Sequence, residues 1–133
     1  MVPSPPSLVY SIDSTARLVL ACASGQLTFN AIVNYAARLR GDCRFCPGFA
    51  EIVDLRAVES ISLSAREVMT LADQIDPFSP NSKRAFVVRQ QDQLNAAHLH
   101  RILRPQTKAI RVFRRIDEAR EWVRISEEAP EAR

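Results

Sequence analysis

Two pairs of residues carry the side chains that hold metals or perform redox chemistry: Cys43 with Cys46, and His98 with His100. In redox enzymes a Cys-x-x-Cys pair begins a helix, whose N-terminus lowers the pKa of one thiol. Here the pair follows a predicted helix, and a Pro-Gly pair comes next. Two residues that are two positions apart on a helix point about 200° apart, so the histidines do not readily face one ion. We therefore interpret the cysteines as loop residues and predict no metal site and no cofactor.

The same residues do not form a catalytic pattern. The chain has no Gly-x-Ser-x-Gly motif, and its three glycines do not form a phosphate-binding loop. Asp54 follows an apolar run without an identifiable partner, so we interpret it as a cap for a loop amide. Cys22, within a predicted strand, is interpreted as a small buried residue. We predict that the protein is not an enzyme.

Residues 49–67 form the stretch around which the other elements are arranged. An apolar run from Phe49 to Leu55 predicts a buried strand, and a short loop then leads to a helix that begins at Ser64. Glu67, three residues later, completes a capping box: the serine hydroxyl accepts from the amide of residue 67, and the carboxylate accepts from the amide of Ser64. In open α/β sheets, sites lie where a strand ends and a helix begins.

The remaining elements follow from hydrophobic periodicity and from Pro and Gly positions. We predict a strand hairpin at residues 8–13 and 17–23, and amphipathic helices at residues 28–40 and 65–76. Two further strands are predicted at residues 84–89 and 108–113, and two further helices at residues 91–103 and from Asp117 onward. The predicted fold is a single α/β domain with the order ββαβαβαβα and a mixed, mostly parallel sheet. We expect a disordered tail at residues 1–7, the domain at 8–125 and a polar tail at 126–133.

The composition is that of a globular domain. Of the 133 residues, 47% are hydrophobic and 25% are charged. We expect no membrane span, because no apolar run approaches the roughly 20 residues that one needs. The first residues lack the pattern of a secretory signal. Three cysteines, an odd number, suit a reducing compartment, so we expect a cytoplasmic location.

Positive charge is concentrated in the second half of the chain. Residues 1–82 carry 6 basic and 8 acidic side chains, whereas residues 83–133 carry 12 and 7. An excess of this kind suits an anionic partner, and we predict a basic anion-facing patch made of Arg101, Arg104, Lys108, Arg111, Arg114 and Arg115. Nucleic acid is disfavoured as the partner because no aromatic residues are interleaved for base stacking. A protein or a small anion fits better.

Three stretches together resemble a known family. They are residues 53–56 (VDLR) with Val58, Ile61 and Ser64 beyond them, residues 44–49 (RFCPGF), and residues 112–119 (VFRRIDEA) closing on residues 121–123 (EWV). Their order and spacing resemble the STAS fold, and more closely the bacterial SpoIIAA-like group. The resemblance spans about residues 8–125.

The resemblance implies a regulatory role. Anti-sigma-factor antagonists of the STAS class are switched by phosphorylation of a serine or threonine that begins the helix after the central strand, and Ser64 has that position. Ser64 is thus either a plain N-cap or a phosphate acceptor, and Ser62 and Arg66 would share its partner-facing surface. Phosphate adds roughly −1.5 to −2 charge, which a helix N-terminus accepts.

We therefore predict a non-enzymatic STAS-like interaction module, a regulatory domain that binds a protein. The alternative is a carrier or sensor of an apolar or amphipathic small molecule, because the SpoIIAA-like group also resembles lipid-carrying CRAL-TRIO folds with a cleft. A homodimer is a further expectation, since exposed sheet edges invite pairing.

Overall fold

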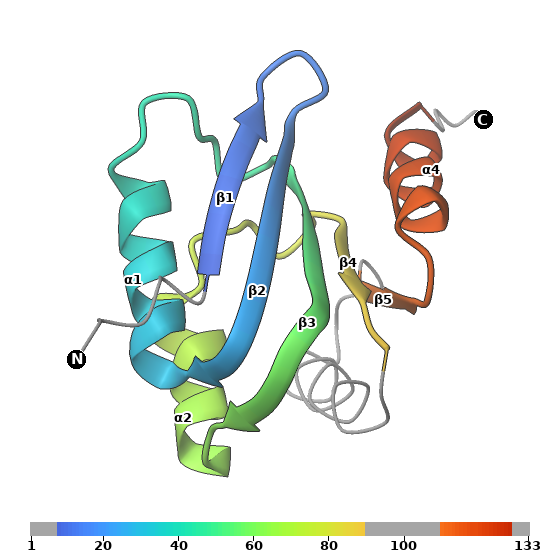
Figure 1. The fold of residues 1–133 in the computed structure, drawn as a ribbon. Helices are drawn as coiled ribbons and strands as arrows, with labels where there is room; N and C mark the ends of the chain where they lie inside the picture. The colour runs from blue at the N-terminus through green and yellow to red at the C-terminus, as the bar shows by residue number, and fades with distance from the viewer. Residues whose placement is uncertain (1–7, 90–109, 129–133) are drawn as a thin grey trace.

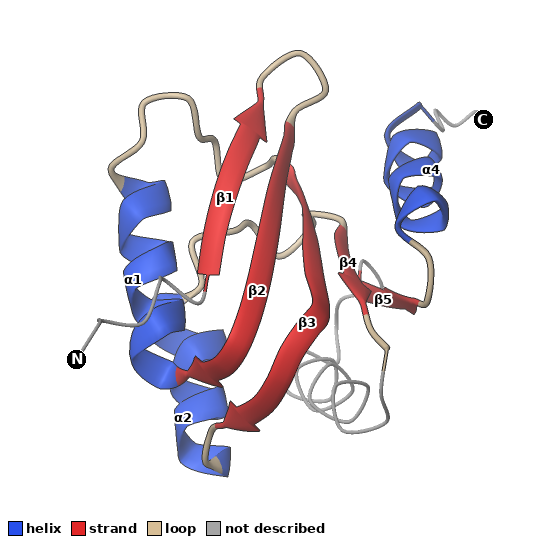
Figure 2. Cartoon of the chain, viewed as in Figure 1, coloured by secondary structure: helices blue, strands red, loops and turns tan. Residues whose placement is uncertain are grey.

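The computed structural model describes residues 8–89 and 110–128. They form an α/β domain built on a five-stranded sheet with the strand order β1-β2-β3-β4-β5 (Figures 1 and 2). The strands are β1 (Leu8–Asp13), β2 (Leu18–Thr28), β3 (Ala50–Ser62), β4 (Arg84–Val87) and β5 (Ile110–Phe113). The helices are α1 (Phe29–Arg40), α2 (Ala65–Thr70), the π-helical turn η1 (Leu71–Ile75) and α4 (Ile116–Glu128). The predicted helix at residues 91–103 lies outside the described residues.

The predicted mixed sheet is confirmed. β1 pairs antiparallel with β2, with Leu8 opposite Ala23 and Asp13 opposite Leu18. Each of the other neighbouring pairs, β2 with β3, β3 with β4 and β4 with β5, is parallel. β3 is the middle strand, as the buried run at residues 49–55 predicts.

β2 and β3 are longer than predicted. Ser24 and Gly25 do not end β2, because the strand passes through them with register shifts against β3 and continues to Thr28. Gly25 has φ +66°, a left-handed conformation that glycine adopts at little cost. β3 likewise continues to Ser62, so the predicted loop after Leu55 is strand. Two long strands that pair in parallel satisfy each other's backbone groups beyond the point where their apolar patterns end.

The helix starts agree closely with the sequence. The Thr28 side chain caps α1 by accepting from the amide of Ala31. The predicted second helix is divided into six α-helical residues and the π-helical turn η1. The last helix begins at Ile116, with Asp117 in its first turn rather than at its cap. It extends to Glu128, three residues into the range expected to be a tail.

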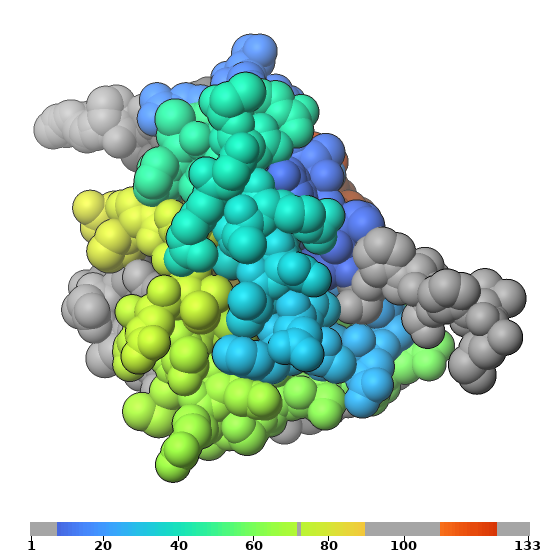
Figure 3. Space-filling model, turned by 90° about the vertical axis from the view of Figure 1, so that its left-hand side faces the viewer, coloured from blue at the N-terminus to red at the C-terminus, as the bar shows by residue number. Residues whose placement is uncertain are grey.

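The helices form a layer on each face of the sheet. α1 and α2 lie on one face and α4 on the other (Figure 1), and Figure 3 looks onto the side formed by α1 and α2. Alternation along the strands supplies a separate core to each layer. The larger cluster, on the α1 and α2 face, includes Val19, Val53 and Leu55. The cluster under α4 includes Ile52, Ala85 and Val123.

Candidate functional site

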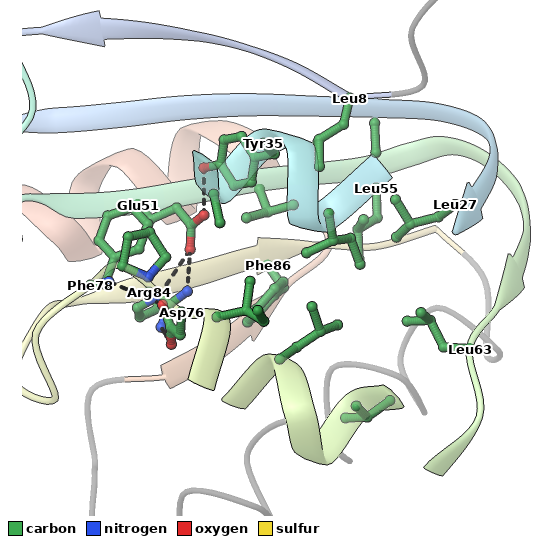
Figure 4. Close-up of a pocket in the computed structure, with 18 of the residues that line it drawn as sticks. Leu8, Leu27, Tyr35, Glu51, Leu55, Leu63, Asp76, Phe78, Arg84 and Phe86 are labelled. Atoms are coloured by element: carbon green, nitrogen blue, oxygen red, sulfur yellow. Dashed lines mark hydrogen bonds and ion pairs between the residues drawn. The ribbon is translucent and has the colours of Figure 1, made fainter. Parts of the chain in front are cut away.

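A cavity of about 380 Å³ lies between the sheet and the layer formed by α1 and α2–η1 (Figure 4). Most of its wall is apolar. The apolar lining comes from β1 (Leu8), β2 (Ala23, Leu27), α1 (Ile32, Ala36), β3 and its end (Val53, Leu55, Ile61, Leu63), α2–η1 and the following turn (Val68, Leu71, Ile75, Pro77, Phe78) and β4 (Phe86). A volume of this size is within the usual range of small-molecule sites, roughly 300–1,000 Å³.

One end of the cavity is polar, and four side chains from four different segments meet there (Figure 4). The Tyr35 hydroxyl of α1 donates to Glu51 Oε2 of β3 at 2.6 Å. Arg84 of β4 donates through Nε to Glu51 Oε1 at 2.8 Å and through a terminal nitrogen to Asp76 Oδ2 at 2.6 Å. The Arg84 guanidinium also lies over the Phe78 ring, 4.5 Å from its centre. We call Tyr35, Glu51, Asp76 and Arg84 the polar end.

The charges of the polar end are withdrawn from water. The side chains of Arg84, Glu51 and Asp76 are 9%, 2% and 6% exposed. Burial by itself lowers the pKa of Arg84, but the charges of Glu51 and Asp76 and their hydrogen bonds outweigh it, so the pKa lies above its ordinary value. Burial raises the pKa of Tyr35 well above its ordinary value, and the charge of Glu51 raises it further. The arginine therefore stays charged and the tyrosine stays a hydrogen-bond donor.

The capping box predicted at Ser64 is present. Ser64 Oγ accepts from the amide of Glu67 at 3.1 Å, and Glu67 Oε1 accepts from the amide of Ser64 at 2.9 Å. Ser64, Ser62 and Arg66 are all exposed. Met69 on the same helix is 50% exposed.

The predicted basic patch is only partly within the described residues. Arg101, Arg104 and Lys108 lie outside them. Arg111 lies over the Trp122 ring of α4 at 5.4 Å. Arg115 pairs with Asp117 at 2.9 Å and is exposed, whereas Arg114 is exposed at the end of β5.

The structure does not bring the cysteines and histidines that could bind metal or perform redox chemistry together in one site. Cys43 and Cys46 are exposed in the loop between α1 and β3, as expected for loop residues, and His98 and His100 lie outside the described residues. Among residues 8–89 and 110–128, no three His, Cys, Asp or Glu side chains are grouped as metal ligands.

One residue prediction is right only in part, and another is wrong. Asp54 does cap a backbone amide, since it accepts from the Arg56 amide at 3.0 Å, but it lies within β3 and not before a loop, and it also pairs with the Arg56 guanidinium at 2.9 Å. Cys22 is not buried but exposed. Strand alternation turns it away from the buried residues Ala21 and Ala23, and it lies two positions beyond Leu20, which packs into the cluster under α4.

The polar end is not predicted from the sequence. One signal was available: Glu51 is a charged residue inside the apolar run of the innermost strand, and a buried carboxylate requires partners. Tyr35 also lies four residues before Leu39, on the buried side of α1. Asp76 and Arg84 gave no such signal, because they join the group only when η1 and β4 pack beside β3.

Two solved structures share the overall fold of this chain. An uncharacterized protein with a SpoIIAA-like fold from Shewanella loihica PV-4 matches with a TM-score of 0.63 and 16% identity, over 92% of this chain and 98% of that one. An anti-sigma factor antagonist from Mycobacterium paratuberculosis matches with a TM-score of 0.60 and 18% identity, over 92% and 99%. The chain therefore has the SpoIIAA-like, STAS-type fold that the sequence predicts.

No protein-family model matches the sequence, and the curated proteins contain no match to it. Within the described part of the chain, no helix has the length and apolar character needed to cross a membrane. The cytoplasmic location, the homodimer and the absence of enzymatic activity stay predictions.

Proposed function

We propose that the protein is a non-enzymatic regulatory module that binds a protein partner through the start of α2. We call the exposed residues Ser62, Ser64, Arg66 and Met69 the α2 surface. The observation that carries the proposal is the exposure of Met69 beside Arg66: residues three apart share a helix face, so an apolar side chain and a cation are presented together. Methionine and arginine are enriched at protein interfaces. The shared fold with an anti-sigma factor antagonist supports a protein as the partner.

Ser64 is the residue through which such a surface would be regulated. Its hydroxyl is exposed and can receive a phosphate, but Glu67 already accepts from the Ser64 amide. A phosphate on Ser64 would lie beside that carboxylate, and the repulsion would open the capping box. Phosphorylation would thus change the conformation at the start of α2 as well as its charge. The same hydroxyl also serves as an N-cap, which accounts for a serine at this position without phosphorylation.

Affinity capture from the native host tests the α2 surface. We expect the wild-type protein to retain a partner that Met69→Asp and Arg66→Glu lose. Arg120→Glu, an exposed charge reversal on α4, is the matched control and should retain it. A partner held equally by wild type and Met69→Asp would contradict the proposal. For the switch, the protein purified from its host should carry the mass of one phosphate, and Ser64→Ala should lack it.

A second candidate function is the carrier or sensor of a small molecule. It is favoured by the cavity of about 380 Å³, because protein interiors contain few voids larger than a water molecule. The cavity and the α2 surface share one element: Val68 and Leu71 face the cavity from the same helical segment that carries Ser64 at its start. Native mass spectrometry of the purified protein tests this candidate, since a carrier retains a small-molecule mass that denaturation releases.

A further inference from the structure

We propose that an uncharged, apolar small molecule in the cavity regulates the α2 surface by holding α2 against the sheet. The inference rests on both candidate functions, because it makes the cavity the regulatory site of the partner-binding surface. Three observations carry it, namely the way α2 is anchored, the cavity beside it and the two opposite faces of the same helix.

α2 is anchored to the rest of the fold at one end. At the end of η1, the Ile75 carbonyl accepts from the Arg40 guanidinium. The next residue, Asp76, pairs with Arg84 at 2.6 Å. In the part of the chain that the structure describes, the side-chain hydrogen bonds of residues 64–70 stay within that segment. The position of α2 itself against the sheet therefore depends on apolar packing.

The junction between α2 and its anchor can bend. In η1 the Asp76 amide donates to the Leu71 carbonyl, five residues earlier, at 2.9 Å. This π-helical spacing is rare and is one of the features at which helices kink. A six-residue α-helix is also too short to be stable by itself in water. α2 can therefore tilt or fray about η1 unless packing on the sheet side supports it.

The packing on the sheet side of α2 is incomplete. Val68 and Leu71 are buried, yet both line the cavity of about 380 Å³. Side chains that line a cavity make fewer contacts than those in a filled core. A molecule in the cavity would contact these side chains and, across from them, Val53 and Leu55 of β3. Its binding would thus favour the conformation in which α2 lies closed on the sheet.

The wall of the cavity favours an uncharged, apolar occupant. Apart from the polar end, the lining is aliphatic or aromatic. The charged side chains of the polar end are covered by protein, since Glu51 is 2% and Arg84 9% exposed, so they present little surface to a ligand. A charged molecule would lose its hydration along the apolar wall without gaining partners, whereas burial of apolar surface is favourable at roughly 25 cal/mol per Å².

The effect reaches the α2 surface because α2 has two faces. Val68 faces the cavity, whereas Arg66 and Met69 on the same helix are exposed. Support at Val68 therefore also fixes the side chains that a partner would meet. A partner that meets an ordered α2 does not have to order it, so occupation of the cavity should strengthen partner binding. By linkage, the partner should strengthen binding in the cavity by the same factor.

The neutral fluorophore N-phenyl-1-naphthylamine is a suitable probe, because its emission rises in apolar surroundings. It is titrated into the full-length protein, and amide hydrogen exchange is then measured with and without it. The Val68 amide donates to the Ser64 carbonyl at 3.0 Å and reports on opening of α2. Because that opening releases the probe, about ten times its Kd should slow exchange at Val68 about tenfold. The Ala119 amide, in the first turn of α4 on the other face of the sheet, should not slow.

Two variants separate the coupling from binding alone. Ser64→Ala removes part of the capping box, and the probe should reverse the faster exchange that we expect at Val68. Ile61→Trp places a large side chain in the cavity and should abolish both the rise in emission and the slowing. Ser11→Ala changes an exposed serine of β1 outside the cavity lining, so this matched control should behave as the wild type.

Unchanged exchange at Val68 in wild-type protein that binds the probe would overturn the coupling, while the carrier function and the α2 surface would both stand. If the wild-type protein does not bind the probe, the coupling fails together with the carrier function. Equal slowing at Val68 and Ala119 would also contradict the coupling, because it would indicate general stabilisation. These results do not depend on whether a variant folds. Capture of a partner through the α2 surface is measured separately.

Discussion

The two faces of the sheet are built in different ways. Under α4, small side chains allow close approach, since Ala50, Ala85 and Ala119 are all buried and the cluster is apolar. Under α1 and α2–η1, the sheet presents a cavity and a buried charge cluster. A dry, filled interface stabilises the domain, whereas a hollow one with buried charges costs stability unless every charge is paired. The difference is the reason we assign a stabilising role to the α4 face and place the proposed function on the α1–α2 face.

The largest effect should come from breaking the polar end. Arg84→Ala removes the guanidinium that pairs with the buried Glu51 and Asp76, and we expect it to lower the free energy of unfolding by about 3–5 kcal/mol. Urea denaturation measures the loss. Arg115→Ala is the control: it removes an exposed ion pair with Asp117 and should change stability little. Equal losses in the two variants would mean that the polar end is solvated and not a buried charge cluster.

Added side-chain volume should destabilise the two faces of the sheet to different extents. Ala119→Leu adds volume to the filled cluster under α4 and should cost about 1–3 kcal/mol of unfolding free energy. Ala36→Leu adds the same volume on α1, where the side chain can extend into the cavity, so its cost should be clearly smaller. Thermal unfolding of the two variants makes the comparison. The contrast between the faces fails if Ala36→Leu is as destabilising as Ala119→Leu.

A smaller effect is expected at the capping box. Ser64→Ala removes the acceptor of the Glu67 amide and should cost about 1 kcal/mol, whereas Ser64→Asp retains an acceptor and should restore most of it. Chemical denaturation measures both variants. Because α2 forms part of the cavity wall, amide hydrogen exchange at Val68 should also accelerate in Ser64→Ala. Unchanged exchange would show that the cap does not hold the wall in place.

The smallest effect concerns pH and the Asp54–Arg56 pair on β3. The hydrogen bond from the Arg56 side chain lowers the pKa of Asp54 below its ordinary value, against the opposing effect of burial. The pair therefore stabilises the folded state above the unfolded pKa of about 4, and the stabilisation is lost as pH falls through the lower folded pKa. Asp54→Asn should flatten the decline of stability with acidification. An unchanged decline, measured by denaturation at several pH values, would contradict the pairing.

Local signals in the sequence were sufficient for the elements themselves. Thr28 and Ser64 are the N-caps that their side chains and spacing predicted, because a cap depends on residues within one turn. The apolar run after Phe49 gave the middle strand, since a strand buried on both faces has few polar positions. The fold class followed from the order of these elements and from the family resemblance.

The length of the strands and the exposure of individual side chains could not be predicted from these local sequence signals. β3 continues to Ser62 because it pairs with β2 over that length. The sequence of neither strand contains a pattern that predicts which strand it pairs with. Cys22 is exposed although its neighbours Ala21 and Ala23 are buried, and which positions of a sheet are covered depends on where helices distant in the sequence pack. Such features depend on contacts between distant segments.

The sequence by itself determined the element types, the capping serine at residue 64 and the mixed sheet, because these depend on neighbours along the chain and on alternation. Only the tertiary structure decided that Tyr35, Glu51, Asp76 and Arg84 meet at one end of a cavity. The physical reason is that a buried charge selects its partners in space. The side chains that satisfy Glu51 come from α1 and β4, and packing against the sheet is what brings them together.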